Sequence, residues 1–559
     1  MGLGILEDRS MEHVPGTVLL NESSTSADTG PANTGLKYDK KTILVPQPSD
    51  DPNDPLNWPL WKRDTILVIL CAISVMAAAL SPILAANTLT LSLYFVHDFT
   101  DVALLTGYHL CGVGVAGVLF VASARVWGKR HLYLLGTLLM IASSAWAGAS
   151  TSYGSLLWAR IFQGIAVAPF EALVNASVGD LYFVHQRGIR MALSNLALFG
   201  SAFFTPILVG LITHTIRWPW TFYLVAIFAA AILPLVFFFV PETTYWRSAH
   251  LNTDTKSLDE WDGQTSADAG YPLRQNGNEH LRNTLATNGE PNGKETGNGN
   301  VNGGVLRSFL PKTSLVRSLL PFNGRKTDEN FFKLLLRPFP LFFHPGIFWA
   351  CLIQGTMIGW TVLIGVVLAA IFLGPPLFYD EVKTGYMYTG AFVGAVLGFI
   401  IAGLLADWSA RWMTARNKGV YEPEFRILLV VPQLVFGCAG LYGFGITSAN
   451  VARYGWFWPD FFFALEVMGM VIGAVASALY IVDAHRDISV EAFTCLLMFK
   501  NFFSFGLTWS AYEWIVRNGI TETFNAIASV QIVVCVLSIP MCEFPALDQF
   551  LLGLRSLIK

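Results

Sequence analysis

Long apolar segments alternate with short polar ones along most of the chain. Apolar runs of about twenty residues match the ~30 Å hydrocarbon core of a bilayer, which a helix of that length crosses. Twelve such spans are predicted between charged or turn-forming breaks, which indicates an all-α membrane protein with two six-helix halves. The spans are residues 65–92, 102–124, 132–150, 155–178, 191–213 and 219–240, then 344–373, 385–406, 425–447, 458–482, 490–514 and 524–544.

Polar segments set the domain boundaries. Residues 1–63 are polar and turn-rich, which predicts a disordered N-terminal tail, and residues 241–340 contain an Asn- and Gly-rich stretch typical of a flexible linker. Near its end, FFKLLLRPFPLFF is typical of an amphipathic helix on a membrane surface. The N-terminal half would then be residues 64–240, the C-terminal half 341–545, and the C-terminal tail 546–559.

Basic residues in the short loops predict the orientation of the chain. With the N-terminus in the cytoplasm, more Lys and Arg residues fall in cytoplasmic than in exterior loops, as the positive-inside rule requires. The cytoplasmic ones are Arg125, Lys129, Arg130, Arg187, Arg190, Arg411, Arg416, Lys418 and Arg486, and the exterior ones are Arg217, Lys383, Arg453 and Arg517. We therefore expect a multi-pass protein of the plasma membrane with both termini, and the linker, in the cytoplasm.

A faint internal repeat supports the division into two halves. Small residues recur at every fourth position in two spans that lie six helices apart, and such stripes let helix backbones approach closely. They are Gly390, Gly394, Gly398 and Ala402 in span eight, and Gly112, Ala116 and Ala124 in span two, where Phe120 interrupts the spacing. Two halves that rock against each other are one explanation, and close packing in a static bundle is the other.

The composition agrees with a membrane protein and excludes several other classes. With 53% hydrophobic and 13% charged residues and a mean hydropathy of +0.50, the chain is too apolar for an ordinary soluble enzyme. Its net charge of −3 gives no basic surface for nucleic acid. The cysteines lie inside apolar runs without a C-x-x-C pair, so packing explains them better than disulfides or a metal site.

The segment LLWARIFQGIAVAPFEAL, residues 156–173, is apolar but contains Arg160 and Glu171. At 100° per residue, the eleven positions between them amount to three turns plus about 20°, so both side chains leave one helix face, about 16 Å apart. Gln163 lies within about 60° of the same line. Because an ionised side chain at the bilayer centre costs about 2.5–3.5 kcal/mol, this face should line a watery or protein interior. A structural ion pair, or snorkelling of Arg160, is the alternative.

Several motifs in the expected order resemble the major facilitator superfamily. LWARIFQGIAVA fits the R-x-x-Q-G pattern on the fourth span of its drug:proton antiporter group. The supporting pieces are DPNDPLNWPLWKRD before span one, ARVWGKR after span two, FVHQRG after span four, RWPWTFY and VPETTYW around span six, NKGVYEPEFR before span nine, and YIVDAHRDISVEAF with KN across spans ten and eleven. The resemblance covers residues 44–545 and is to the fungal twelve-span branch of that group.

The resemblance implies roles for individual residues. Arg160 would be the motif arginine that helps to couple proton movement to substrate movement, and Gly164 would let its helix pack closely. Asp407 and Arg411 would lock the helix ends in one of two conformations. The full set of implied latch and packing residues is Gly128, Lys129, Arg130, Gly164, Pro206, Gly403, Asp407 and Arg411.

Two motifs depart from the family pattern. In ARVWGKR, Arg125 occupies a place where an acidic residue is usual, so we expect an asymmetric latch and do not assign Arg125 the role of the missing aspartate. In span five, TPILVG keeps Pro206 but has Thr205 and Val209 where glycines are expected. Since that motif is associated with antiport, its change leaves the direction of transport open.

By the same resemblance, spans one, four, seven and ten line the cavity, so their polar residues are candidate site residues. These are Asn87, Arg160, Gln163, Glu171, Gln354, Trp360 and Glu466. Lys500 of span eleven lies at a depth similar to that of Glu466, so we expect the two to meet near mid-membrane. They would form a buried ion pair, or Glu466 would be a protonation site, because low dielectric favours the neutral carboxyl group.

The function these observations favour is proton-coupled transport by alternating access, not catalysis. The favoured direction is export of an amphipathic small molecule such as a drug, toxin or fungal secondary metabolite, and the alternative is import of a polyamine-like or other small organic solute. We expect no cofactor, with the proton gradient as energy source. The partners would be a small-molecule substrate, protons and the lipid bilayer, without nucleic acid, and the protein would be monomeric.

Overall fold

The computed structural model describes residues 18–19, 37–39, 42–44, 46–245, 319–322, 324–327, 329–417, 420–484 and 488–543. The predictions for most of the N-terminal tail, for most of the linker and for the C-terminal tail lie outside these residues, as do Lys418 and Arg486 of the orientation argument.

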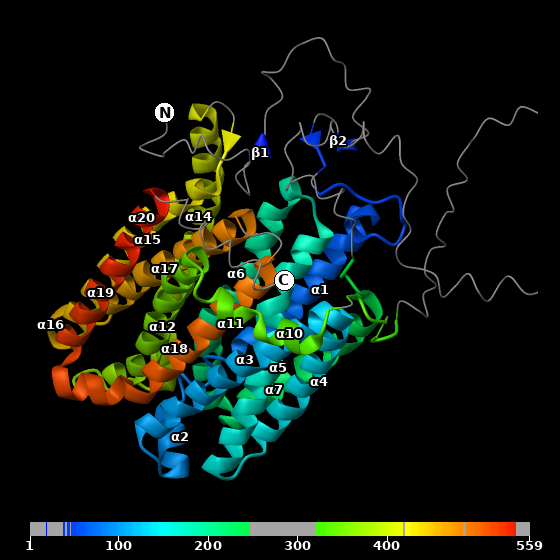
Figure 1. Cartoon of the computed structure of the whole chain (residues 1–559). Coiled ribbons are helices and arrows are strands. Elements are labelled where there is room, and N and C mark those ends of the chain that lie inside the picture. Colours follow the sequence, from blue (N-terminus) through cyan, green and yellow to red (C-terminus); the bar gives the residue numbers. More distant parts are fainter. Residues whose placement is uncertain are drawn as a thin grey trace, which may run out of the picture.

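The described chain folds almost entirely into helices, which form two groups side by side (Figure 1). By length and apolar composition, eleven helical stretches of the described residues are able to cross a membrane. The first group contains α1 (Leu60–Ala79), α2 (Thr88–Phe95), α3 (Phe99–Trp127), α4 (Arg130–Gly148), α5 (Tyr153–Leu181), α6 (Val184–Thr215) and α7 (Pro219–Phe239). The second contains α12 (Pro345–Leu373), α13 (Glu381–Tyr386), α14 (Thr389–Arg416), α15 (Val430–Ser448), α16 (Val451–Tyr454), α17 (Phe457–Ala484), α18 (Ser489–Asn518), α19 (Ile520–Val536) and α20 (Ser538–Glu543).

Short elements complete the structure at the ends of the bundle. Each of the four strands among the described residues is two residues long, and β1 pairs with β4 while β2 pairs with β3. The strands are β1 (Val18–Leu19), β2 (Tyr38–Asp39), β3 (Thr42–Ile43) and β4 (Val420–Tyr421), and 3₁₀ turns cover Pro55–Asn57 and Pro423–Leu429. The end of the bundle where α3 and α7 finish and α4 starts is called the linker end below.

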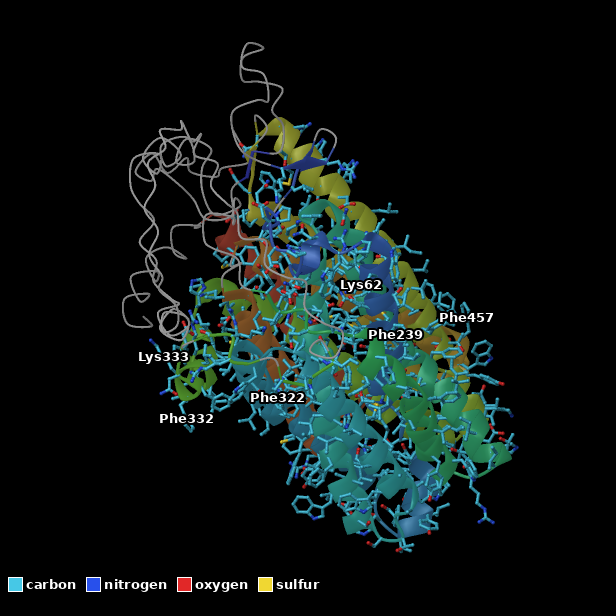
Figure 2. All side chains as sticks on the ribbon, turned by 90° about the vertical axis from the view of Figure 1, so that its right-hand side faces the viewer. Lys62, Phe239, Phe322, Phe332, Lys333 and Phe457 are labelled. Carbon is cyan, nitrogen blue, oxygen red and sulfur yellow. The ribbon has the colours of Figure 1, made fainter. Side chains whose placement is uncertain are left out.

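The segment predicted as a helix on the membrane surface forms two short helices, α10 (Phe331–Leu336) and α11 (Pro338–Leu341), and its place on a membrane stays a prediction. Leu334 is buried against the end of α3, whereas Phe332 is 69% exposed. Figure 2 shows Phe332 and Lys333 projecting from the side of the molecule. The helix therefore packs one apolar side chain on the bundle and turns another outward.

The first predicted span is not one continuous helix. Residues 65–92 were expected to form a single span, but α1 ends at Ala79 and α2 begins at Thr88. Pro82 lies in the break, where its ring and its missing N–H are incompatible with a continuing helix. In a continuous helix the N–H of Ala85 would donate to the carbonyl of Ser81, but here it donates to that of Pro82, 2.9 Å away. The Ser81 carbonyl therefore has no helical donor.

The small-residue stripes bring helices into contact in both halves, as the repeat predicted. In the first half, a Cβ atom on Gly112 of α3 would lie 2.6 Å from the carbonyl oxygen of Ile161 on α5. In the second half, Gly390, Gly394 and Gly398 of α14 face backbone atoms of α17 in the same manner. Close backbone approach therefore relates spans two and four, and equally spans eight and ten.

Gly164 provides a test of this packing. A Cβ at Gly164 would overlap the carbonyl oxygen of His109 on α3, whereas a Cβ at Gly179, on the same helix, would meet nothing within 4 Å. We expect Gly164→Ala to lower the free energy of unfolding by about 1–3 kcal/mol, because the helices must separate. Thermal unfolding of the purified protein would measure this, with Gly179→Ala as the matched control. Equal midpoints for the two variants would contradict the packing argument.

Candidate functional site

A cavity lies between the two helical halves. Its empty space, including the part that is open to solvent, is about 1130 Å³. Its walls come from the α1–α2 break and from α3, α5 and α6 of the first half, and from α12, α17, α18 and the residue before α14 in the second half. The lining is largely apolar and includes the aromatic rings of Phe199, Phe203, Phe463, Tyr388 and Tyr512.

An ion pair joins the halves at this cavity. The Lys500 ammonium on α18 lies 2.7 Å from a carboxylate oxygen of Glu171 on α5, and both residues line the cavity. The expected partner of Lys500 was Glu466, so the structure replaces that pairing with one across the halves. Glu171 is ten residues from the end of its helix and Lys500 eleven from the start of its own, so the pair sits about 15 Å from the linker end.

Glu466 is held inside the second half instead. Its side chain is fully buried, and one carboxylate oxygen accepts a hydrogen bond of 2.7 Å from the hydroxyl of Thr361 on α12. The other oxygen is buried without a hydrogen-bond partner in the described part of the chain. Thr361 lines the cavity and Glu466 does not, so a threonine hydroxyl separates the carboxyl group from the cavity.

Arg160 occupies the break in the first span. It is fully buried and donates to the carbonyl oxygens of Leu80 at 2.6 Å, Ser81 at 3.2 Å and Leu105 at 3.3 Å. It also donates to the side-chain oxygen of Gln163, 3.0 Å away. The guanidinium is therefore satisfied by two carbonyls at the break, one carbonyl of α3 and the Gln163 side chain, and it neither snorkels nor lines the cavity.

The remaining expected cavity residues lie outside the lining. Asn87 is fully buried just before α2, and its side-chain polar atoms lack partners among the described residues. Gln354 accepts from Ser477 at 3.1 Å, which ties α12 to α17. Trp360 donates to Gln531 of α19 at 3.0 Å. Helical position alone did not reveal these neighbours, which orient the polar groups within the second half.

At the linker end, the first-half latch residues bind two acidic residues, Glu242 and Asp180. Gly128 adopts φ +91°, and a carboxylate oxygen of Glu242 accepts the backbone N–H of Lys129 at 3.0 Å while the other accepts that of Arg130 at 3.1 Å. The Lys129 ammonium contacts Asp180 of α5 at 2.5 Å. Glycine is needed because a Cβ at residue 128 would overlap the carboxylate. Glu242 thus caps the positive end of α4.

The second half repeats one of these contacts. Arg426, before α15, donates to Asp483 near the end of α17 at 3.0 Å. Asp180 has the corresponding place near the end of α5. Neither aspartate was predicted from the sequence. Their matching places near the ends of two spans six helices apart are the feature that could have identified them.

The second-half latch does not cross between the halves. Arg411 lies 3.9 Å from Asp407 on the same helix, both side chains are largely exposed, and Gly403 has no neighbouring atom within 4 Å of a Cβ. Exposed pairs of this kind contribute about 0–1 kcal/mol. The expected lock between helix ends is therefore absent from these two residues.

Arg125, which was not assigned the role of the missing aspartate, forms an ion pair between the halves at this end. Its guanidinium lies 2.7 Å from the carboxylate of Glu491 in the first turn of α18, and Glu491 is 2% exposed. Arg337, between α10 and α11, lies 3.4 Å from the same carboxylate. The latch is asymmetric as expected, but its partner could not be deduced from the sequence.

Contacts between the halves also exist at the opposite end. The hydroxyl of Thr90 on α2 donates to Glu381 of α13 at 2.5 Å. On α6, Pro206 packs its carbonyl against Gly385, where a Cβ would lie 2.7 Å from that oxygen. The cavity is therefore flanked by inter-half contacts on both sides.

The comparisons with known proteins cover most of the chain. The model of the Major Facilitator Superfamily matches residues 66–490. Protein HOL1 of Saccharomyces cerevisiae is 25% identical over 567 residues, covering 95% of this chain and 94% of HOL1. Efflux pump vrtL of Penicillium aethiopicum is 22% identical over 497 residues, covering 87% of this chain and 86% of that protein.

A solved structure supports the fold. The proton:xylose symporter XylE of E. coli, bound to 6-bromo-6-deoxy-D-glucose, superposes with a TM-score of 0.55, covering 87% of this chain and 96% of XylE. The sequences are 14% identical, so this likeness concerns the arrangement of helices and not the solute.

The Arg125–Glu491 contact predicts a labelling result. Cys495 is fully buried one turn after Glu491. With the other cysteines replaced by serine, we expect Arg125→Ala to speed maleimide labelling of Cys495 about fivefold or more, since losing about 1 kcal/mol changes an opening equilibrium by that factor. Arg411→Ala should leave the rate unchanged. If Arg125→Ala also leaves it unchanged, the pair does not hold this end closed.

Proposed function

Because the chain belongs to the Major Facilitator Superfamily, we propose that it is a proton-coupled secondary transporter that exports an amphipathic small molecule by alternating access. The observation that carries the proposal is the cavity between the halves, with apolar walls and one ion pair. Apolar and aromatic walls bind a greasy body, while a few placed polar groups orient it. A drug, toxin or secondary metabolite has this character.

The two sets of inter-half contacts support alternating access. Arg125 and Glu491 close the linker end, and Thr90 with Glu381 closes the other. Rocking one half against the other would break one set while keeping the second, which opens the cavity to one side at a time. With both termini cytoplasmic, the linker end would face the cytoplasm of a plasma-membrane protein.

Glu466 is the proposed proton-binding group. A carboxylate oxygen without a hydrogen bond is costly in its charged form, and Thr361 offers a route for a proton from the cavity. Proton coupling needs no further energy source. A 100 mV potential supplies about 2.3 kcal/mol per charge and one pH unit about 1.4 kcal/mol. The sum, about 3.7 kcal/mol, sustains a gradient of several hundred-fold for a neutral solute.

Export is favoured by the similarity to vrtL, which is named an efflux pump. A second candidate, import of a polyamine-like cation or another small organic solute, is favoured by the carboxyl groups of Glu171 and Glu466 at and behind the cavity wall. The fold serves either direction, so transport measurements must choose between them.

Accumulation of labelled dyes and polyamines in cells with and without the gene, at two external pH values, tests the proposal. Export predicts lower accumulation that rises when a protonophore is added, and import predicts the opposite sign. We expect Arg160→Ala to abolish either effect while the protein still reaches the membrane, because the α1–α2 break loses the donors that hold its carbonyls. Full activity of this variant would contradict its role in coupling.

The proton site has its own prediction. We expect Glu466→Gln to stop concentrative transport and to remove its dependence on the protonophore, while exchange of solute down its gradient continues, because glutamine cannot gain or lose the proton. Asp460→Asn, at the start of the same helix, is the matched control, since Asp460 accepts from the backbone N–H of Gly390 at 3.2 Å. Concentrative transport by Glu466→Gln would place the proton elsewhere.

A further inference from the structure

The Glu171–Lys500 pair uses only part of its hydrogen-bonding capacity. An ammonium has three donors and a carboxylate about four acceptor sites. In the described part of the chain, these two groups contact each other and no further hydrogen-bond partner. Their side chains are 11% and 12% exposed, and both line the cavity. Their remaining donors and acceptors are therefore available to an occupant of the cavity.

Most other polar groups of the lining are already engaged. The hydroxyls of Tyr388 and Tyr512 each donate at 2.7 Å to a helix carbonyl, and Thr88 donates to Leu84 at 3.1 Å. Three lining hydroxyls, those of Ser81, Thr106 and Ser504, have no hydrogen-bond partner among the described residues, and Ser504 is buried one turn after Lys500 on α18. Lys500 and Ser504 thus place unused polar capacity side by side on one helix.

The charges of the lining cancel. Among the described lining residues, Lys500 and Glu171 supply one positive and one negative charge. Glu466 lies outside the lining, behind the Thr361 hydroxyl. An organic monocation drawn to Glu171 would sit beside the Lys500 ammonium, and a monoanion drawn to Lys500 beside the Glu171 carboxylate. Like charges in a low-dielectric site repel strongly, so each excess charge is penalised.

We propose that the Glu171–Lys500 pair is the substrate-recognition site and that it selects a net-neutral amphipathic molecule. The molecule carries an acceptor for the ammonium and a donor for the carboxylate, as in a zwitterion or an amide, on an aromatic or otherwise apolar body. The inference rests on the proposed function in taking the occupant as the transported solute. It disfavours a polyamine, which would bring further positive charge to Lys500.

The position of the pair adds a reason for selectivity. Glu171 belongs to the first half and Lys500 to the second, so a bound molecule that bridges them touches both moving parts. A molecule with both a donor and an acceptor can satisfy the two charges together. A singly charged molecule satisfies one and leaves the other unpaired, which is costly in a buried site.

Two dyes with one xanthene body test the charge rule. Rhodamine B is a zwitterion at neutral pH, and its ethyl ester is a monocation of nearly the same size. Binding to the purified full-length protein in lipid nanodiscs is measured by fluorescence anisotropy. We expect rhodamine B to bind at least about tenfold more tightly than the ester, because like-charge contact is strongly unfavourable.

Two variants should move this preference in opposite directions. Lys500→Met leaves Glu171 unpaired and should make the ester the tighter ligand. Glu171→Gln leaves Lys500 unpaired and should raise the preference for rhodamine B above the wild-type ratio. Arg517→Met, which removes an exposed ion pair with Glu513 on the same helix, is the matched control and should keep the wild-type ratio.

Three results would overturn the proposal. They are equal binding of the two dyes by the wild-type protein, binding of neither dye, and a wild-type ratio retained by either cavity variant. Glu171→Gln keeps the test decisive if Lys500→Met fails to fold. The proposed function has a separate test. It fails if no solute moves in response to the proton gradient in the cell assay, whatever the ratio of the two dye affinities.

Discussion

A buried arginine needs hydrogen-bond acceptors that a bilayer does not offer, and this requirement organises the first half of the molecule. The acceptors are carbonyls at the end of α1, free because Pro82 interrupts the helix. The same break supplies Ser81, Pro82 and Thr88 to the cavity wall. Arg160 thereby stabilises irregular backbone at membrane depth without entering the cavity. A substitution at Arg160 would therefore alter the cavity wall by shifting this backbone.

Between the halves, ionic contacts lie at different depths and serve different purposes. Arg125 and Glu491 join the halves at the linker end, whereas Glu171 and Lys500 join them at the cavity. Glu491 of the first pair also contacts Arg337, next to α10. The segment that leads into the second half therefore contributes to the contacts at the linker end. The second pair faces open space and has capacity left for a ligand.

The two halves share a packing scheme but differ in their charges. Close backbone approach relates α3 with α5 and α14 with α17, and Lys129–Asp180 corresponds to Arg426–Asp483. The two glutamates at and behind the cavity wall have different partners. Glu466 of the second half accepts a hydrogen bond from Thr361, whereas Glu171 of the first half pairs with Lys500. In the function we propose, this asymmetric charge distribution on a symmetric frame would let one half bind protons while the boundary between the halves binds solute.

The sequence by itself determined the membrane-spanning class, the two halves, most helix positions and the close packing at Gly112, Gly164 and the α14 stripe, because these depend on local hydrophobicity, length and side-chain size. It also located ionisable groups at mid-membrane depth. Only the tertiary structure decided their partners. Depth along a helix follows from counting residues, but the direction a side chain faces depends on how each helix is rotated and which neighbour it meets. That is why Lys500 faces Glu171 of the other half and not Glu466, and why Trp360 and Gln354 lie outside the cavity.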